Sequence, residues 1–265
     1  MRTPTLLSLF GCCTLFGGGW LWLNASAEEI KSPPPTAAPA KPAAAPVAEE
    51  KEKEKEPPAL TTYKGRTIAQ TMHWQGAPWL QRREREQEEN GGLMREQLEV
   101  KPGQTVCDLG SGDGYHTLWM AGVVGDTGKV YAVDIQKEML EMLQKRAEGR
   151  GIKNIISALG TPWDPKLPPA SQDLILLVDV YHEFSHPEHM LKAMRTALKP
   201  DGRMVLVEFR SEDDHVPIKP EHKMSKAQIL KEILPMGFKL VKEFDDLPWQ
   251  HFMSFAKDEP SPAAK

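Results

Sequence analysis

A glycine-rich turn and two carboxylates mark the part of the chain with the residue types to bind a nucleoside. The turn, DLGSGDGY (residues 108–115), follows a short apolar run. Glycines at 110, 112 and 114 let the backbone bend sharply and approach a ligand, because no Cβ stands in the way. A second apolar run, residues 129–133, ends at Asp134, whose carboxylate can accept hydrogen bonds from two ribose hydroxyls. The pattern predicts the nucleoside-binding first half of a doubly wound α/β domain.

The spacing of these glycines distinguishes between two classes of nucleoside. The dinucleotide fingerprint G-x-G-x-x-G would place its third glycine at position 115, where this chain has Tyr115. Pyrophosphate favours a helix N-terminus without nearby negative charge, whereas this turn carries Asp108 and Asp113. The spacing D-x-G-x-G-x-G resembles motif I of the class I S-adenosylmethionine-dependent methyltransferases. Their cofactor carries a sulfonium and an ammonium group and no phosphate, so acids beside the turn are acceptable.

A second segment carries the same resemblance about ninety residues further on. Residues 198–208, LKPDGRMVLVE, look like the family's "LKPGGRLVLVE" element before strand five, with Asp201 in place of a usual glycine. The resemblance covers roughly Gln97 to Lys257. It implies S-adenosylmethionine as cofactor and a doubly wound Rossmann-like sheet of seven strands, in the order 3-2-1-4-5-7-6 with the last strand antiparallel. The segments TMHW, DVYHEF and PWQHF are also similar to bacterial exported or membrane-linked methyltransferase-domain proteins of unassigned substrate.

The resemblance also implies which residues contact the cofactor. The turn would hold the methionine portion through backbone groups, Asp134 the ribose, and Ile135 would cover the adenine. After strand three the family often has an acid near the adenine amine. This chain lacks it and offers Thr161 instead. The predicted cofactor-binding residues are Asp108, Gly110, Ser111, Gly112, Gly114, Asp134, Ile135, Thr161 and Asp179.

The stretch DVYHEFSH, residues 179–186, contains the candidates for catalysis. It follows a continuous apolar run, 173–178, which is typical of a central parallel strand buried on both faces. Methyl transfer requires placement of the nucleophile and exclusion of water, and a base only where the acceptor must lose a proton. His182 is the candidate base, with Glu183 as an orienting partner or alternative and Tyr181 beside them. The alternative interpretation is that these side chains shape the pocket wall or cap the next helix.

Two further questions concern a metal and the acceptor. His182, His186 and His189 do not form a helical ligand pair, because Pro187 breaks the register, and the sequence has no H-E-x-x-H motif. We therefore predict no metal site.

The acceptor is expected to contact residues 208–210, the loop 211–223 and residues 249–251.

These residues need a particular set of elements to position them. We expect strands at 105–109, 129–133, 154–159, 173–178, 203–209, 238–244 and 251–256. Helices are expected between them at 115–123, 136–148, 187–198 and 226–234. Such alternation predicts a parallel sheet with helices on both faces. Upstream, residues 68–89 are expected to be helical with an interruption at 74–80, forming an N-terminal helical lid.

The two ends of the chain differ in composition from this domain. Arg2, the apolar stretch 6–23 and the A-x-A sequence at 25–27 predict a signal peptide or membrane anchor over residues 1–27. Residues 28–60 form a predicted disordered Pro/Ala and Lys/Glu linker, 61–257 the methyltransferase domain and 258–265 a flexible tail. Export to the periplasm, or anchoring by the N-terminal segment, is the first prediction. A retained leader with a cytoplasmic-facing domain stays open, because the cofactor is made in the cytoplasm.

Composition limits the function classes. The net charge is −4 and no basic cluster is present, so a nucleic-acid partner is not expected. Cys107 is the one cysteine outside the leader, which excludes a disulfide framework. The first hypothesis is methyl transfer to a small or lipid-like acceptor. The alternatives are a non-catalytic binding module that keeps the fold, and a nicotinamide-dependent oxidoreductase, against which Tyr115 argues.

Overall fold

The structure, a computed structural model, describes residues 56–259. The predictions for the leader, for most of the linker and for the end of the tail concern residues 1–55 and 260–265, which lie outside the described residues. Within the described part, no helix has both the length and the apolar character needed to cross a membrane.

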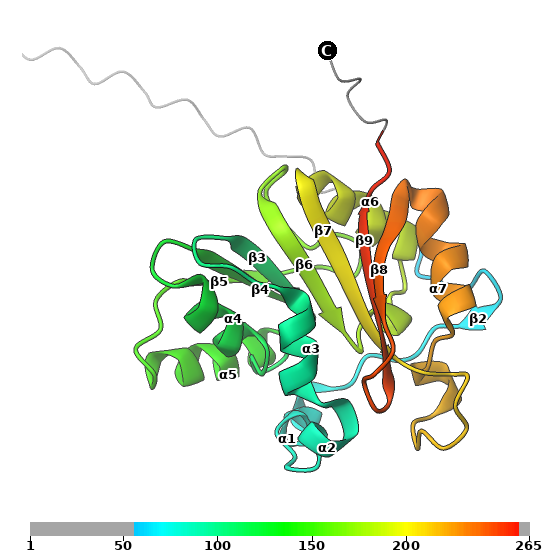
Figure 1. Cartoon of the computed structure of the whole chain (residues 1–265), viewed down its shortest axis with the longest axis horizontal. Coiled ribbons are helices and arrows are strands. Elements are labelled where there is room, and N and C mark those ends of the chain that lie inside the picture. The colour runs from blue at the N-terminus through cyan, green and yellow to red at the C-terminus, as the bar shows by residue number, and fades with distance from the viewer. Residues whose placement is uncertain (1–55, 260–265) are drawn as a thin grey trace, which may run out of the picture. The chain divides into compact units, whose positions relative to one another are not determined.

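A seven-stranded sheet forms the centre of the domain (Figure 1). Its strands are β3 (Thr105–Leu109), β4 (Lys129–Asp134), β5 (Ile155–Leu159), β6 (Gln172–Val178), β7 (Leu198–Phe209), β8 (Phe238–Phe244) and β9 (Gln250–Lys257). Their spatial order is β5-β4-β3-β6-β7-β9-β8, and β9 runs antiparallel to both of its neighbours. This confirms the predicted order 3-2-1-4-5-7-6 with an antiparallel last strand.

Helices cover both faces of the sheet because the central strands are apolar on both faces. Cys107 of β3 packs in one core cluster with residues of α6 (Pro187–Ala197) and α7 (Lys226–Ile233). Its neighbour Val106 faces the opposite way and packs with residues of α3 (Gly91–Leu98) and α4 (Thr117–Val124). Helix α5 (Lys137–Glu148) contacts β4 and β5. Successive side chains of a strand point to opposite faces, so one apolar strand serves both layers.

The segment before the sheet departs from the predicted helix. It contains a small hairpin, β1 (Thr62–Tyr63) and β2 (Arg66–Thr67), and then the short helices η1 (Trp74–Gly76), α1 (Ala77–Leu80) and α2 (Arg85–Glu89). A helix starting at Ile68 is therefore wrong. Residues 68–73 are not helical, and their backbone bonds to other parts of the domain, as in the bond from the Ala69 amide to the His182 carbonyl at 3.2 Å.

Three single-turn helices complete the domain: η2 (Tyr181–Glu183), η3 (Pro220–His222) and η4 (Leu234–Met236). Helix η2 follows β6 directly, and η3 lies in the connection between β7 and α7. The two ends of that connection lie next to each other, because the Met224 amide donates to the Phe209 carbonyl at 2.9 Å. The two helices contact each other, so side chains from distant parts of the sequence meet above the sheet.

Candidate active site

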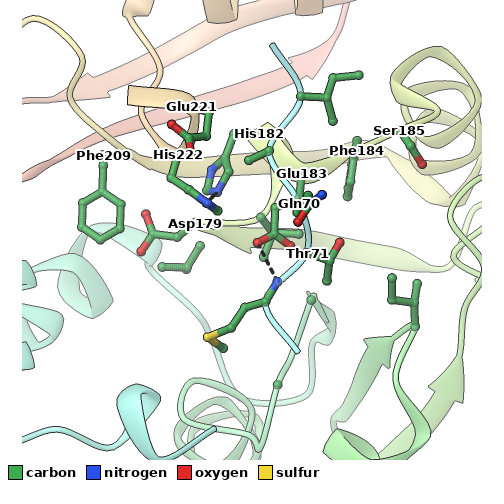
Figure 2. Close-up of a pocket in the computed structure, with 18 of the residues that line it drawn as sticks. Gln70, Thr71, Asp179, His182, Glu183, Phe184, Ser185, Phe209, Glu221 and His222 are labelled. Carbon is green, nitrogen blue, oxygen red and sulfur yellow. Dashed lines mark hydrogen bonds between the residues drawn. The ribbon is translucent and has the colours of Figure 1, made fainter. Parts of the chain in front are cut away.

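A cleft of about 1570 Å³ lies where several parallel strands of the sheet end. Its walls come from the turn after β3, the end of β4, the segment after β6 and the connection after β7. In open α/β sheets, ligands bind in this position, outside the carboxyl ends of the strands. Figure 2 shows Asp179, His182, Glu183 and His222 around this cleft.

The turn after β3 has a conformation and a packing that require glycine. Gly110, Gly112 and Gly114 have φ values of 75°, 53° and 90°, in the left-handed region. A Cβ on Gly114 would stand 2.1 Å from a methyl group of Leu143, and one on Gly110 would stand 2.4 Å from Val180. Gly110 and Gly112 line the cleft, so the backbone of the turn is open to a ligand there.

Asp134 joins the turn to the end of β4. Its Oδ2 accepts the Gly112 amide hydrogen at 2.9 Å, and its Oδ1 accepts that of Gln136 at 2.9 Å. Burial raises the pKa of this carboxyl, while the hydrogen bonds from Gln136 and Gly112 lower it. Each carboxylate oxygen keeps a second lone pair, and Asp134 lines the cleft. The residue is therefore held in place to accept further hydrogen bonds from a ligand.

Three of the predicted cofactor residues in the turn do not line the cleft: Asp108, Ser111 and Gly114. The carboxylate of Asp108 accepts a hydrogen bond from the Thr117 hydroxyl at 2.5 Å. Burial raises the pKa of Asp108 to about 6, against the lowering effect of Thr117. The Ser111 hydroxyl is buried without a hydrogen-bond partner. All three residues are buried in the protein, on the side of the turn away from the cleft.

Ile135 and Thr161 both line the cleft, as the sequence predicts for residues near an adenine. Ile135 is 43% exposed and offers an apolar surface for a flat ring. The Thr161 hydroxyl instead accepts a hydrogen bond from the Asp164 amide at 3.0 Å, within its own loop. Ile135 is thus free to contact a ligand through its side chain, whereas the Thr161 hydroxyl already has a partner.

Asp179 presents an unpaired carboxylate oxygen at the cleft. The residue directly follows β6 and has a φ of 55°, a left-handed value that few residues other than glycine adopt. Its Oδ2 accepts a hydrogen bond from the Gln250 side chain at 2.7 Å, whereas its Oδ1 is buried without a partner. Burial raises the pKa of Asp179 well above its usual range, and the charges of Glu89 and Glu208 raise it further. An unpaired buried oxygen of this kind is suited to a cationic group of a ligand.

His182 lies between a buried carboxylate and a second histidine. Its Nδ1 is 2.6 Å from Oε2 of Glu208, and its Nε2 is 3.1 Å from Nδ1 of His222. Burial lowers the pKa of the His182 imidazole, but the charge and hydrogen bond of Glu208 outweigh this and the net shift is upward. The partner that orients His182 is therefore Glu208, whereas sequence reasoning named Glu183. The sequence could have indicated Glu208, because it lies near the carboxyl end of β7, the parallel neighbour of β6.

Glu183 and Tyr181 have different surroundings. Glu183 lines the cleft and accepts the Met72 amide hydrogen at 3.3 Å (Figure 2). Burial raises the pKa of Glu183 to about 7. Tyr181 is fully buried and does not line the cleft, and its hydroxyl donates to Oε2 of Glu232 at 2.8 Å. The structure thus places Tyr181 in the core, away from any substrate.

Residues 60–80, which we call the crossing segment, bridge the two walls of the cleft. On the β6 side, the Leu60 amide donates to the Ser185 carbonyl at 2.9 Å. On the β4 side, the Gln136 side chain accepts from the Trp74 amide at 2.7 Å and donates to the Met72 carbonyl at 2.9 Å. The crossing segment therefore spans the cleft, but it consists of the β1–β2 hairpin, a non-helical stretch and short helices, whereas a helical lid was expected.

The strand order, the glycine turn and Asp134 at the end of β4 together define a class I S-adenosylmethionine-dependent methyltransferase. Residues 100–255 match the family model described as a methyltransferase domain, and the chain belongs to this family. Proteins of this class use S-adenosylmethionine. The open glycine backbone, the held carboxylate of Asp134 and the unpaired oxygen of Asp179 fit the ribose and the cationic groups of that cofactor.

Comparison with individual proteins supports the family and the fold. The chain is 30% identical over 152 residues to a protein-L-isoaspartate O-methyltransferase of Fervidobacterium nodosum, covering 57% of this chain and 66% of that protein. It is 32% identical over 129 residues to a ubiquinone/menaquinone biosynthesis C-methyltransferase of Ectopseudomonas mendocina, covering 45% of this chain and 50% of that protein. A crystal structure of a SAM-dependent methyltransferase from Aquifex aeolicus matches 70% of this chain and 98% of that one, with a TM-score of 0.66 at 22% identity. The chain thus spans between half and 66% of the length of these two curated relatives.

Proposed function

We propose that this chain transfers a methyl group from S-adenosylmethionine to a small or lipid-like acceptor. The observation that carries the proposal is that one continuous cleft contains both Asp134 with the glycine turn and His182 with Glu183. When bound, the cofactor supplies a methyl group that its sulfonium already activates. The protein must then bind the nucleoside at Asp134, face the cationic groups with Asp179 and hold the acceptor against the methyl carbon.

The size and lining of the cleft support an acceptor with apolar surface. Pockets for small ligands commonly have volumes of about 300–1000 Å³, so a cleft of about 1570 Å³ leaves room beside a nucleoside cofactor. Apolar side chains line the part near His182, among them Phe184, Phe209 and Ile218. The relative named for ubiquinone/menaquinone biosynthesis agrees with such an acceptor.

We place activation of the acceptor at His182. Its Nδ1 faces Glu208, so its Nε2 is the ring nitrogen that would reach an acceptor, in place of its contact with His222 at 3.1 Å. An imidazole held in this way can take part in removing a proton from an acceptor hydroxyl. Glu183, with a pKa raised by burial to about 7, is the alternative group for this role.

The primary test is calorimetric titration of the purified protein with S-adenosylmethionine and with its demethylated product. We expect one site with micromolar affinity, lost in Asp134→Ala and retained in Asp126→Ala, which removes an exposed acid from a turn. Folded wild-type protein that gives no heat with either ligand would overturn the proposal. A parallel fluorescence titration with NADH tests the oxidoreductase alternative, for which we expect no binding.

A second experiment separates an enzyme from a non-catalytic binding module. The protein is incubated with cofactor carrying a radiolabelled methyl group and with a lipid extract or an aqueous metabolite extract. We expect label in an extractable product, and less of it with His182→Ala. Binding of the cofactor without any transfer from either extract favours the non-catalytic module.

Export remains a prediction from the leader sequence. We propose that the domain acts outside the cytoplasm, either free after cleavage at Ala27 or anchored by residues 1–27. Mass spectrometry of the mature N-terminus tests this, since an intact leader would contradict cleavage.

A further inference from the structure

Three side chains with metal-binding atoms converge in the cleft next to the proposed cofactor site. The ring nitrogens of His182 and His222 and a carboxylate oxygen of Glu183 lie within 4.8 Å of one another. We propose that His182, Glu183 and His222 bind one divalent transition-metal ion of the Zn²⁺ type. The sequence alone predicts no metal, because Pro187 breaks the register of the nearby histidines and no H-E-x-x-H motif is present.

The distance between the two histidines suits two ligands of one ion. Nε2 of His182 lies 3.1 Å from Nδ1 of His222, and their rings are nearly perpendicular at 79°. Two nitrogens bound to Zn²⁺ at 2.0–2.1 Å in tetrahedral geometry lie about 3.3 Å apart. The pair therefore needs almost no movement to hold an ion in place of a proton. Figure 2 shows the two rings side by side at the cleft.

Glu208 gives His182 the support that metal-binding histidines usually have. A histidine ligand commonly donates its second ring N–H to a carboxylate, which fixes the tautomer and the ring orientation. Here Nδ1 of His182 is 2.6 Å from Oε2 of Glu208, and both side chains are almost fully buried. The other oxygen of Glu208 accepts the Tyr181 amide hydrogen at 2.8 Å, so the carboxylate is itself held. With the proton on Nδ1, the lone pair of Nε2 faces the cleft.

Glu183 supplies the third donor and a negative charge. Its carboxylate is mostly buried, and a buried carboxylate is costly unless a cation or hydrogen bonds compensate it. Its hydrogen bond from the Met72 amide is long at 3.3 Å, and Thr71 is a second partner, so binding of an ion would replace one of these contacts. Two imidazoles and one carboxylate form a donor set that suits Zn²⁺ and similar ions, whereas Mg²⁺ and Ca²⁺ prefer oxygen ligands.

The ion would act at the end of the cleft where the acceptor binds. This role rests on the proposed methyl transfer, whereas binding of the ion does not. Three protein ligands leave a coordination position open, and these residues line the cleft that also contains Asp134. An acceptor hydroxyl held there would lose its proton to solvent more readily, and His182 would then act as a ligand of the ion and not as the base. Its oxygen would then form the bond to the methyl carbon, while the S–C bond breaks and its electron pair stays on sulfur.

The test uses the full chain, treated with a chelator, dialysed and titrated calorimetrically with Zn²⁺. We expect one site per chain in the wild-type protein and no comparable binding of Mg²⁺. His222→Ala and Glu183→Gln should each weaken Zn²⁺ binding at least about tenfold, the lower bound known for loss of even a supporting residue. Co²⁺ in place of Zn²⁺ should give visible absorption bands that His222→Ala abolishes.

Two controls keep the result specific. His215→Ala removes an exposed histidine from the same connection, and we expect Zn²⁺ affinity to stay unchanged. His222→Ala should retain the affinity for the demethylated cofactor, and Asp134→Ala should retain the Zn²⁺ site. These two variants distinguish failure of the metal site from failure of the cofactor site.

The proposal is overturned if the folded wild-type protein binds no Zn²⁺, in which case His182 and His222 share a proton. It is equally overturned if His222→Ala and Glu183→Gln bind Zn²⁺ as tightly as the wild type. Circular dichroism of each variant verifies folding, and His222→Asn replaces His222→Ala if the latter does not fold.

Discussion

Nδ1 of His182 and Oε2 of Glu208 lie 2.6 Å apart although 26 residues separate them in sequence. The strands that precede and contain these residues, β6 and β7, are parallel neighbours, so their carboxyl ends bring the two side chains together. Both side chains are almost completely excluded from solvent. A buried pair of this kind is costly to break, because each partner would lose its compensation.

Replacing Glu208 by glutamine should lower the free energy of unfolding by about 1–3 kcal/mol. The carboxylate accepts hydrogen bonds from the Tyr181 amide and from His182, whereas a glutamine side chain has a single acceptor oxygen. Urea denaturation measures the difference. The matched control is Glu212→Gln, since Glu212 also pairs with a histidine but is about half exposed. We expect a loss below about 1 kcal/mol there, and equal losses for the two variants would contradict the argument.

Gly114→Ala should destabilise the domain by more than about 2 kcal/mol, because a new Cβ would overlap the Leu143 side chain and the φ of 90° suits glycine alone. Chemical denaturation again provides the measurement. Gly122→Ala is the control, since Gly122 lies within α4 and a Cβ there would meet no atom within 4 Å. Alanine at that helical position should stabilise by up to about 1 kcal/mol. A Gly114→Ala variant as stable as the wild type would show that the turn relaxes freely.

The stability of the protein should fall as the pH rises through about 6, in part because of Asp108. Burial raises the pKa of Asp108 from 3.8 to about 6, so the folded state favours the protonated form. This contribution is fully present below about pH 4 and is lost as the pH rises through the folded pKa. It amounts to about 3 kcal/mol.

Asp108→Asn removes this titration and keeps an acceptor for the Thr117 hydroxyl. The difference in unfolding free energy between variant and wild type should therefore change in favour of the variant between pH 4 and pH 8. Denaturation at several pH values measures the difference, and a difference independent of pH would refute the assignment.

Gln136→Ala should loosen the crossing segment at its β4 side. The variant loses the bonds with the Trp74 amide and the Met72 carbonyl, each worth about 0.5–1.5 kcal/mol. Hydrogen exchange at the Trp74 amide should accelerate roughly tenfold. Gln144→Ala, which removes an exposed glutamine of α5, should leave that rate unchanged. Unchanged exchange in both variants would mean that these bonds do not hold the segment.

Much of the sheet could be predicted because local patterns determine it. The apolar runs, the glycine turn and the acid at position 134 are local features of the sequence, and six of the seven strands have bounds within one residue of those expected. Strand β7 begins at Leu198, five residues before the expected start at Arg203. The conformation of residues 68–73 could not be predicted in this way. Their backbone bonds to distant carbonyls and side chains, and these tertiary contacts outweigh local helix propensity.

The candidate site was predicted less completely for the same physical reason. His182 and Glu183 lie beside each other, but Glu208 and His222 arrive from segments 26 and 40 residues away. Tyr181 looked equivalent to its neighbours in sequence. In the structure its hydroxyl instead bonds to Glu232, 51 residues away in α7, and so faces the core. Side-chain direction after a strand depends on packing that no single segment contains.

The unpaired oxygen of Asp179 has a consequence for turnover. Burial raises the pKa of this acid, and its Oδ1 has no hydrogen-bond partner, so a positively charged group of a ligand would stabilise the carboxylate form. The cofactor enters with a positive sulfur and leaves with a neutral one. Both forms keep the ammonium group, so an attraction between Asp179 and the cofactor would be weaker for the spent molecule, which would favour its replacement by new cofactor.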